Sequence, residues 1–164
     1  MPDDRRDALR RKYLSLGSGE LVAAGAFAAV AVIMVVPRLA TRDDSAALWS
    51  ALIPLLIVLI QAGVFWLVAR SWVGRHPMPS RLALLYRAFR VIDAAFLVAG
   101  LIGVIAWFPD QVGPAVLVAG VWIFGVVEYL NYFAVRLAYP VGRWWSTVGQ
   151  RRRPRLVQDI DAAR

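Results

Sequence analysis

A few polar side chains stand inside long apolar stretches of this sequence, and these residues are the most able to do chemistry. Glu20, Gln61, Asp93, Glu128 and Asn131 each lie within or at the edge of such a stretch. In a membrane, an ionisable side chain at such a position is costly unless it is paired or hydrated. Each of the five is therefore a candidate for a structural contact or for a functional site.

The densest group of hydrogen-bonding side chains runs from Glu128 to Phe133. In a helix, Glu128 and Tyr132 share a face because they are four residues apart. At a rise of about 1.5 Å per residue, Gln61 and Asp93 come to the same depth as this group. We expect one polar cluster there, which is also the candidate binding site, formed by Gln61, Arg90, Asp93, Glu128, Asn131, Tyr132 and Arg136.

Two interpretations of this cluster stay open. As a structural feature, it would hold helices together through interhelical hydrogen bonds, with Asp93 and Glu128 neutralised by Arg90 or Arg136. As a site, it would be a polar pocket that opens toward one side of the membrane. Whether these side chains are packed shut or line a cavity separates the two interpretations.

Several classes of chemistry are excluded by composition. Cysteine is absent and His76 is the single histidine. The chain therefore has no disulfide, iron–sulfur cluster or thiolate zinc site, and it lacks the histidines for other common metal sites. P-loop, Rossmann and nucleophile-elbow motifs are also missing from the sequence. We expect neither a metal nor a cofactor, and no catalytic residue can be assigned.

The elements that must position these residues are long apolar helices. Hydrophobic residues make up 60% of the 164 residues, and the mean hydropathy is +0.59, which exceeds what a soluble domain of this size can bury. Four apolar runs have the length that a helix needs to cross about 30 Å of hydrocarbon. We expect an all-α integral membrane protein, a four-helix transmembrane bundle with spans at residues 20–36, 46–69, 91–108 and 112–139.

Basic residues are distributed unevenly around these spans. Of the 19, five precede the first span, five lie between the second and third, and seven follow residue 135, whereas only Arg38 and Arg42 lie elsewhere. The positive-inside rule then places both termini and the middle loop in the cytoplasm. The bias toward arginine, alanine and valine also favours a bacterial origin, and hence a location in the cell membrane.

Outside the spans, the sequence predicts a basic amphipathic arm over residues 1–19 and a basic tail over residues 140–164, with the transmembrane domain at 20–139 between them. Four arginines of the tail are expected to contact anionic lipid headgroups, and no nucleic acid is expected: Arg151, Arg152, Arg153 and Arg155. The expected partners are the lipid bilayer and either a second copy of the chain or another membrane protein.

The two halves of the sequence can be laid over one another. Glu20 and Asp93 each open an Ala/Gly-rich span, and Gln61 and Glu128 hold corresponding positions in the next span of each half. This pattern predicts a 2+2 parallel repeat about an axis along the membrane normal. Small residues predict close helix contacts at Gly25, Gly100, Gly103, Gly120 and Gly125.

Three functions fit these observations. The first is a small non-enzymatic membrane protein, an accessory, assembly or regulatory partner, in which the polar cluster is fully paired. The second is a small transporter or channel-like protein with a protonatable Glu128/Asp93 site, which needs an aqueous path to these residues. The third is a lipid-modifying membrane enzyme with a pocket lined by Tyr129, Tyr132 and Arg136.

Overall fold

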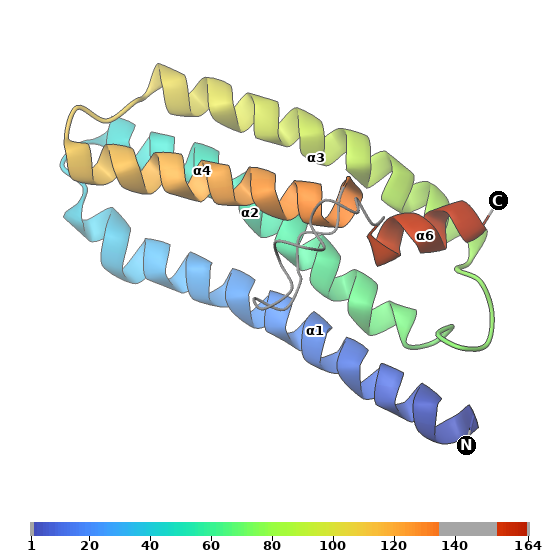
Figure 1. Ribbon diagram of the computed structural model, residues 1–164. Coiled ribbons are helices and arrows are strands. Elements are labelled where there is room, and N and C mark those ends of the chain that lie inside the picture. Colours follow the sequence, from blue (N-terminus) through green and yellow to red (C-terminus); the bar gives the residue numbers. More distant parts are fainter. Residues whose placement is uncertain (1, 135–153, 164) are drawn as a thin grey trace, which may run out of the picture.

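Four long helices lie side by side, and a short helix packs against one end of them (Figure 1). A computed structural model of the chain describes residues 2–134 and 154–163. Within these residues the α-helices are α1 (Pro2–Val30), α2 (Arg42–Ala69), α3 (Ser80–Ala106), α4 (Val112–Phe133) and the short α6 (Arg155–Ala162).

Each of the four long helices is long and apolar enough to cross a membrane. The expectation of an all-helical chain with four apolar helices packed together is confirmed at this level. The predicted fourth span extends to residue 139, and its part beyond Ala134 lies outside the described residues.

The first helix joins the basic arm to the apolar span without a break. Because no proline falls between Pro2 and Pro37, α1 runs through Glu20 and continues as a π-helical turn, Ala31–Val35, and a short 3-10 helix, Val36–Arg38. The arm predicted for residues 1–19 is therefore one rigid body with the first span. Similarly, α3 starts at Ser80, so its first three turns carry Arg81, Arg87 and Arg90, which precede the predicted span.

The core of the bundle forms around α2, which contacts each of the other three long helices. Of its most apolar 18 residues 50% are buried, against 28% in α3 and 11% in each of α1 and α4. Phe65, Leu52 and Leu55 of α2 are among the largest fully buried side chains. The outer faces of the other helices expose branched apolar residues such as Val22, Ile102 and Val116, and these faces are suited to contact membrane lipid.

Glycines allow α2 to approach both of its sequence neighbours closely. A Cβ on Gly17 of α1 would lie 2.9 Å from the carbonyl oxygen of Gly63, and one on Gly100 of α3 would lie 2.5 Å from the carbonyl oxygen of Ser50. The predicted close contacts at Gly100 and Gly103 are confirmed, and Gly125 makes an ordinary contact. The prediction was wrong for two glycines, which face open space: Gly25 and Gly120.

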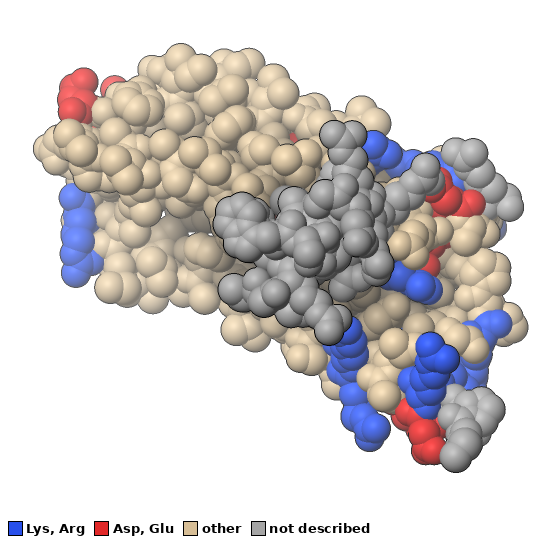
Figure 2. Space-filling view, viewed as in Figure 1, with Lys and Arg blue, Asp and Glu red and all other residues tan. Residues whose placement is uncertain are grey.

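The two ends of the bundle differ in charge. The end made by the first turns of α1, the segment between α2 and α3, and α6 is called the basic end here, because Lys and Arg gather on it (Figure 2). The end made by residues 39–41 and 107–111 is called the opposite end, and it carries three carboxylates beside its two arginines: Asp43, Asp44 and Asp110.

Candidate functional site

The polar residues of the spans form two clusters rather than the single one expected, because α2 stands between them. Gln61 of α2 joins Tyr86 and Asp93 of α3 on one side of α2, and these three residues are called the closed cluster. On the other side, residues of α1, α2 and α4 form the open cluster: Glu20, Trp66, Glu128, Asn131 and Tyr132.

The carboxylate of the closed cluster is packed shut. Asp93 is 1% exposed, and its Oδ1 accepts a hydrogen bond from Nε2 of Gln61 at 2.9 Å. The hydroxyl of Tyr86 donates to the backbone carbonyl oxygen of Gln61 at 3.1 Å. These contacts tie α3 to α2 at a depth where no hydrophobic force drives helices together, as structural polar contacts do in membranes.

The open cluster is built around the hydroxyl of Tyr132. This hydroxyl donates to Oε1 of Glu20 and accepts a hydrogen bond from Nε1 of Trp66 at 3.4 Å, so that it links α4 to both α1 and α2. One turn earlier on α4, Glu128 is hydrogen-bonded by the side chain of Asn131 and lies close enough to Glu20 for the two carboxylates to repel each other. Two acidic groups thus lie near each other where α1 and α4 meet, a line of contact that we call the α1–α4 seam.

The open cluster forms the inner wall of a cavity of about 390 Å³ at the basic end. Glu20, Trp66, Asn131 and Tyr132 contribute polar groups to this wall, whereas Glu128 is not part of the described lining. The remaining described lining comes from the arm of α1 and from the start of α6: Leu9, Lys12, Tyr13, Leu16, Pro154, Arg155 and Leu156. We call this space the basic-end cavity.

The short helix α6 closes one side of the basic-end cavity. It is amphipathic, and it buries Leu156, Asp159 and Ile160 against α3 and α4. Nε of Arg155 forms an ion pair with Oδ1 of Asp159 at 2.9 Å, and Arg87 of α3 donates to the carbonyl oxygen of Ile160 at 3.1 Å.

Asp159 is the titratable group that holds α6 in place. Burial raises the pKa of this carboxyl, and the positive charge of Arg155 and the nearby Trp72 indole act in the opposite direction. Nε1 of Trp72 and Oδ2 of Asp159 are both buried without a satisfactory hydrogen-bond partner among the described residues. We therefore expect a change in the protonation of Asp159 to alter the contact between α6 and the bundle.

Arg90, which was also predicted for the cluster, does not enter either cluster through its side chain. Arg90 is exposed, and its carbonyl oxygen accepts a hydrogen bond from the hydroxyl of Tyr129 at 3.0 Å. Of the four tail arginines, Arg155 lines the basic-end cavity. Arg136 and three of the tail arginines lie outside the described residues: Arg151, Arg152 and Arg153.

Two residues of the cavity wall, Tyr13 and Trp66, were missed from the sequence, and Glu20 was a candidate but was not included in the expected cluster. A signal that links Tyr13 to Glu20 was present, because Tyr13, Gly17, Glu20 and Ala24 repeat with spacings of four, three and four residues, which puts them on one helix face. The small residues on this face mark it as the packed one, and all four are at least partly buried. Trp66 lies near the end of an apolar span, where tryptophan commonly anchors a helix at the membrane interface, and nothing local distinguishes it from such an anchor.

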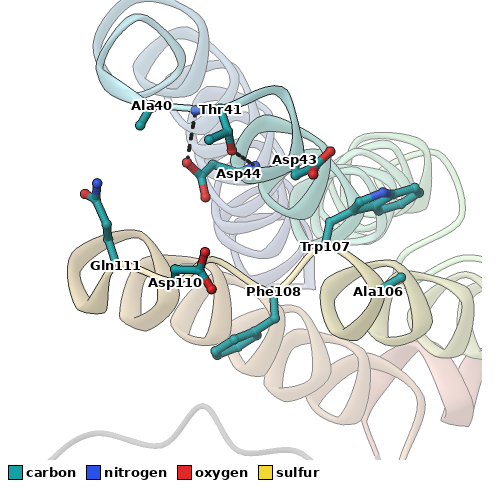
Figure 3. A pocket seen from close by; sticks show the side chains of 9 residues that line it. All are labelled: Ala40, Thr41, Asp43, Asp44, Ala106, Trp107, Phe108, Asp110 and Gln111. Carbon is teal, nitrogen blue, oxygen red and sulfur yellow. Dashed lines mark hydrogen bonds between the residues drawn. The ribbon is translucent and has the colours of Figure 1, made fainter.

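A second pocket lies at the opposite end of the bundle and encloses about 220 Å³ (Figure 3). Asp43, Asp44 and Asp110 line it, but the role of Asp44 is structural. Its Oδ2 accepts from the Thr41 backbone N–H at 3.2 Å, and its own N–H donates to Oγ1 of Thr41 at 3.0 Å, a capping box at the start of α2. Within the described parts of the chain, no group of three or more metal-binding side chains occurs.

No protein-family model, curated protein or solved structure matches this chain. The function is therefore inferred from the geometry of the two clusters and of the basic-end cavity.

Proposed function

We propose that this chain is a small polytopic, non-enzymatic protein of the cell membrane, an accessory, assembly or regulatory partner that acts through its basic end. Four helices able to cross a membrane support the membrane location. In this proposal the basic end and both termini face the cytoplasm, because 17 of the 19 basic residues belong to segments on that side.

The contrast between the two clusters carries the proposal. The closed cluster uses Asp93 as an internal contact between helices, which fits a structural role. The open cluster faces a cavity of about 390 Å³, which lies in the volume range of small-molecule sites. Lys12 and Arg155 also line this cavity. A cavity at the basic end that combines apolar, polar and charged side chains can hold a binding partner without catalysing a reaction.

A photoreactive amino acid incorporated into this protein in living cells tests which end of the bundle contacts a partner. In place of Leu9, which lines the basic-end cavity, it should crosslink to a discrete partner, either a lipid or a protein. The matched control replaces Gln111 at the opposite end, where we expect no crosslink. Equal crosslinking at both positions, or none at Leu9, would overturn the proposal that the basic end is the working surface.

A small transporter is the second candidate, because Glu20 and Glu128 face each other beside the cavity. Such a carboxylate pair can hold a proton or a cation between its members. Glu20 and Glu128 thus replace the expected Glu128/Asp93 pair as the more suitable site, since Asp93 is sealed against α2.

Proteoliposomes that contain a pH-sensitive dye separate these two functions. Under the accessory function, the wild-type protein should not raise proton flux above that of protein-free liposomes. A flux that Glu20→Gln and Glu128→Gln both abolish with folding intact, and that Asp93→Asn leaves unchanged, would establish the transporter instead.

The enzyme alternative has less support. Tyr129, one of its three expected pocket residues, turns its hydroxyl to the Arg90 carbonyl oxygen and is absent from the described cavity lining. Tyr132 does line the cavity, but its hydroxyl is engaged by Glu20 and Trp66.

A further inference from the structure

The inner wall of the basic-end cavity combines a carboxylate with aromatic rings. Glu20 lies beside Tyr132 and Trp66, and the ring of Tyr13 packs edge-on against Trp66 with centroids 4.9 Å apart. The hydrogen bond from Tyr132 engages Oε1 of Glu20, and Oε2 remains an acceptor. A carboxylate next to several aromatic rings favours an ammonium group, through charge and cation–π attraction together.

The rim of the same cavity is positively charged. Lys12 of α1 and Arg155 of α6 line it and are both exposed to solvent. Arg155 uses Nε for its ion pair with Asp159, so that its terminal nitrogens can still donate to an anion. The cavity therefore presents negative charge at its inner wall and positive charge at its rim. A ligand that complements both carries an ammonium group and an anionic group on one short chain.

An apolar pocket of about 370 Å³ lies farther along the same α1–α4 seam. Phe27 of α1 and Phe124 of α4 line it, and Leu55 of α2 lies on its wall. Phe27 is seven residues beyond Glu20, or about 10 Å along the helix. Gly120 adds to the open space, since nothing lies within 4 Å of the position a Cβ would take there. The seam thus runs from a polar cavity to an apolar one, which matches an amphiphile with a headgroup and an acyl chain.

The α2–α3 seam provides an internal comparison. There, Leu82, Leu85, Tyr86 and Phe89 of α3 line a pocket of about 260 Å³ together with Gln61 and Val64 of α2. In α1 the same spacings are held by Leu9, Lys12, Tyr13 and Leu16, all of which line the basic-end cavity.

The two seams differ in polarity at positions that face their pockets. Lys12 stands where the other seam has Leu85, and Asn131 stands where it has Val64. The seam that seals Asp93 is apolar, and the seam that leaves Glu20 accessible has gained polar groups. Helix packing alone does not require Lys12 and Asn131, because Leu85 and Val64 occupy the corresponding positions in the α2–α3 seam.

We infer that the basic-end cavity binds the phosphoethanolamine headgroup of a membrane lipid, with the ammonium on Glu20, the phosphate at Lys12 and Arg155, and an acyl chain along the α1–α4 seam. This inference rests on the proposed function, because it names the ligand through which the basic end works. The phosphate binds at the rim, and the ethanolamine folds inward from it so that the ammonium meets Glu20. The acyl chain, which is joined to the phosphate through glycerol, passes beside the ethanolamine into the apolar part of the seam.

Native mass spectrometry of the full-length protein released from lipid nanodiscs tests the inference. From nanodiscs that contain equal amounts of phosphatidylethanolamine and phosphatidylglycerol, the wild-type protein should retain phosphatidylethanolamine about tenfold more than phosphatidylglycerol, as expected for one added charge-assisted contact. Glu20→Gln should abolish this preference. Lys12→Glu, which changes an exposed residue and leaves the core intact, should weaken retention of both lipids.

The matched control is Asp110→Asn, which removes an exposed carboxylate at the opposite end and should leave lipid retention unchanged. Equal retention of the two lipids by the wild-type protein would overturn the inference, as would displacement of the lipid by soluble phosphoethanolamine at equal concentration. A crosslink from position 9 to a protein, without any lipid preference, would refute the inference and leave the proposed function standing.

Discussion

Single residues within the closed cluster reveal a shortage of hydrogen-bond donors. Gln61 donates from Nε2 to Asp93, but Oε1 of Gln61 and Oδ2 of Asp93 are both buried without a partner among the described residues. One further N–H or O–H between the two side chains would satisfy both. A neutral side chain at position 93 that can donate a hydrogen bond would therefore satisfy Oε1 of Gln61, which a carboxylate cannot do.

Asp93→Asn is expected to keep or raise the free energy of unfolding, because its amide N–H can donate to Oε1 of Gln61. Asp93→Leu should lower that free energy by about 1–3 kcal/mol, since it leaves the Gln61 amide buried and unpaired. Thermal unfolding of the purified protein in detergent micelles compares the two variants. An asparagine variant less stable than the leucine variant would contradict the pairing.

The sequence predicted most of the polar residues of the site, but it did not predict that they form two separate clusters. Gln61, Asp93, Glu128, Asn131 and Tyr132 all lie in polar clusters at the basic half of the bundle. Helical periodicity gives the face of a residue and its depth, but not the neighbour that this face meets. That α2 separates Asp93 from Glu128 depends on the packing of four helices, which no local pattern encodes.

At the level of helices, the contact of α6 with the bundle includes a buried carboxyl, that of Asp159. Burial raises the pKa of Asp159 above its ordinary value despite Arg155 and Trp72. The docked helix therefore binds a proton more tightly than the undocked helix does. Docking is strongest below the ordinary aspartate pKa and weakens as the pH rises through the raised pKa of the docked state.

Asp159→Asn should remove this pH dependence and hold α6 more tightly at neutral pH. Because the chain has no cysteine, a nitroxide label on Ala162→Cys reports the mobility of α6 without a competing thiol. In the parent protein the label should become less mobile as the pH falls from 7 toward 4. If the asparagine variant showed the same pH response, Asp159 would not be the responsible group.

Helix contacts make a second prediction at this scale. Gly100→Ala should destabilise the protein by about 1–3 kcal/mol, because the added Cβ would lie 2.5 Å from the Ser50 carbonyl oxygen and force α3 away from α2.

The matched control for this prediction is Gly120→Ala, which faces open space and should be neutral or slightly stabilising, as alanine favours a helix over glycine. The measurement is the unfolding midpoint of each variant. Equal midpoints for the two alanine variants would refute the close approach of α3 to α2.

At the scale of the whole molecule, the sequence predicted four helices because the bilayer leaves few alternatives. An apolar run of membrane length must satisfy its own backbone, so length and hydropathy suffice to find it. The α6 helix was not predicted, because its amphipathic pattern covers only eight residues and a helix of this length depends on tertiary packing. The glycine contacts were predicted in part, because Gly25 and Gly100 look alike in sequence and only packing distinguishes them.

The orientation of the molecule can be measured directly in cells. With no native cysteine, Ser71→Cys at the basic end and Gln111→Cys at the opposite end each introduce one exposed thiol. The positive-inside rule predicts that a membrane-impermeant maleimide labels position 111 in intact cells and labels position 71 only after lysis. The reverse pattern would place the basic end outside.

The 2+2 repeat, still a prediction, gains support from the two seams. Asp93 meets Gln61 across the α2–α3 seam, and Glu20 meets Glu128 across the α1–α4 seam, as a two-fold relation between halves requires. Tyr86 and Tyr13 lie seven residues before these two acids and are both buried. Duplication would explain how one seam could keep its structural contacts while the other acquired polar groups.

Because α1 is continuous, a movement of its arm is transmitted to the membrane span. The helical run continues past Val30 to Arg38, so the part of α1 that precedes Glu20 extends over about 27 Å, or about five turns, outside the first span. A protein or charged surface that grips the projecting arm can tilt or rotate the span with it. Because Tyr13 and Glu20 stand on this same rod, such a pull would change the width of the cavity and hence what it retains.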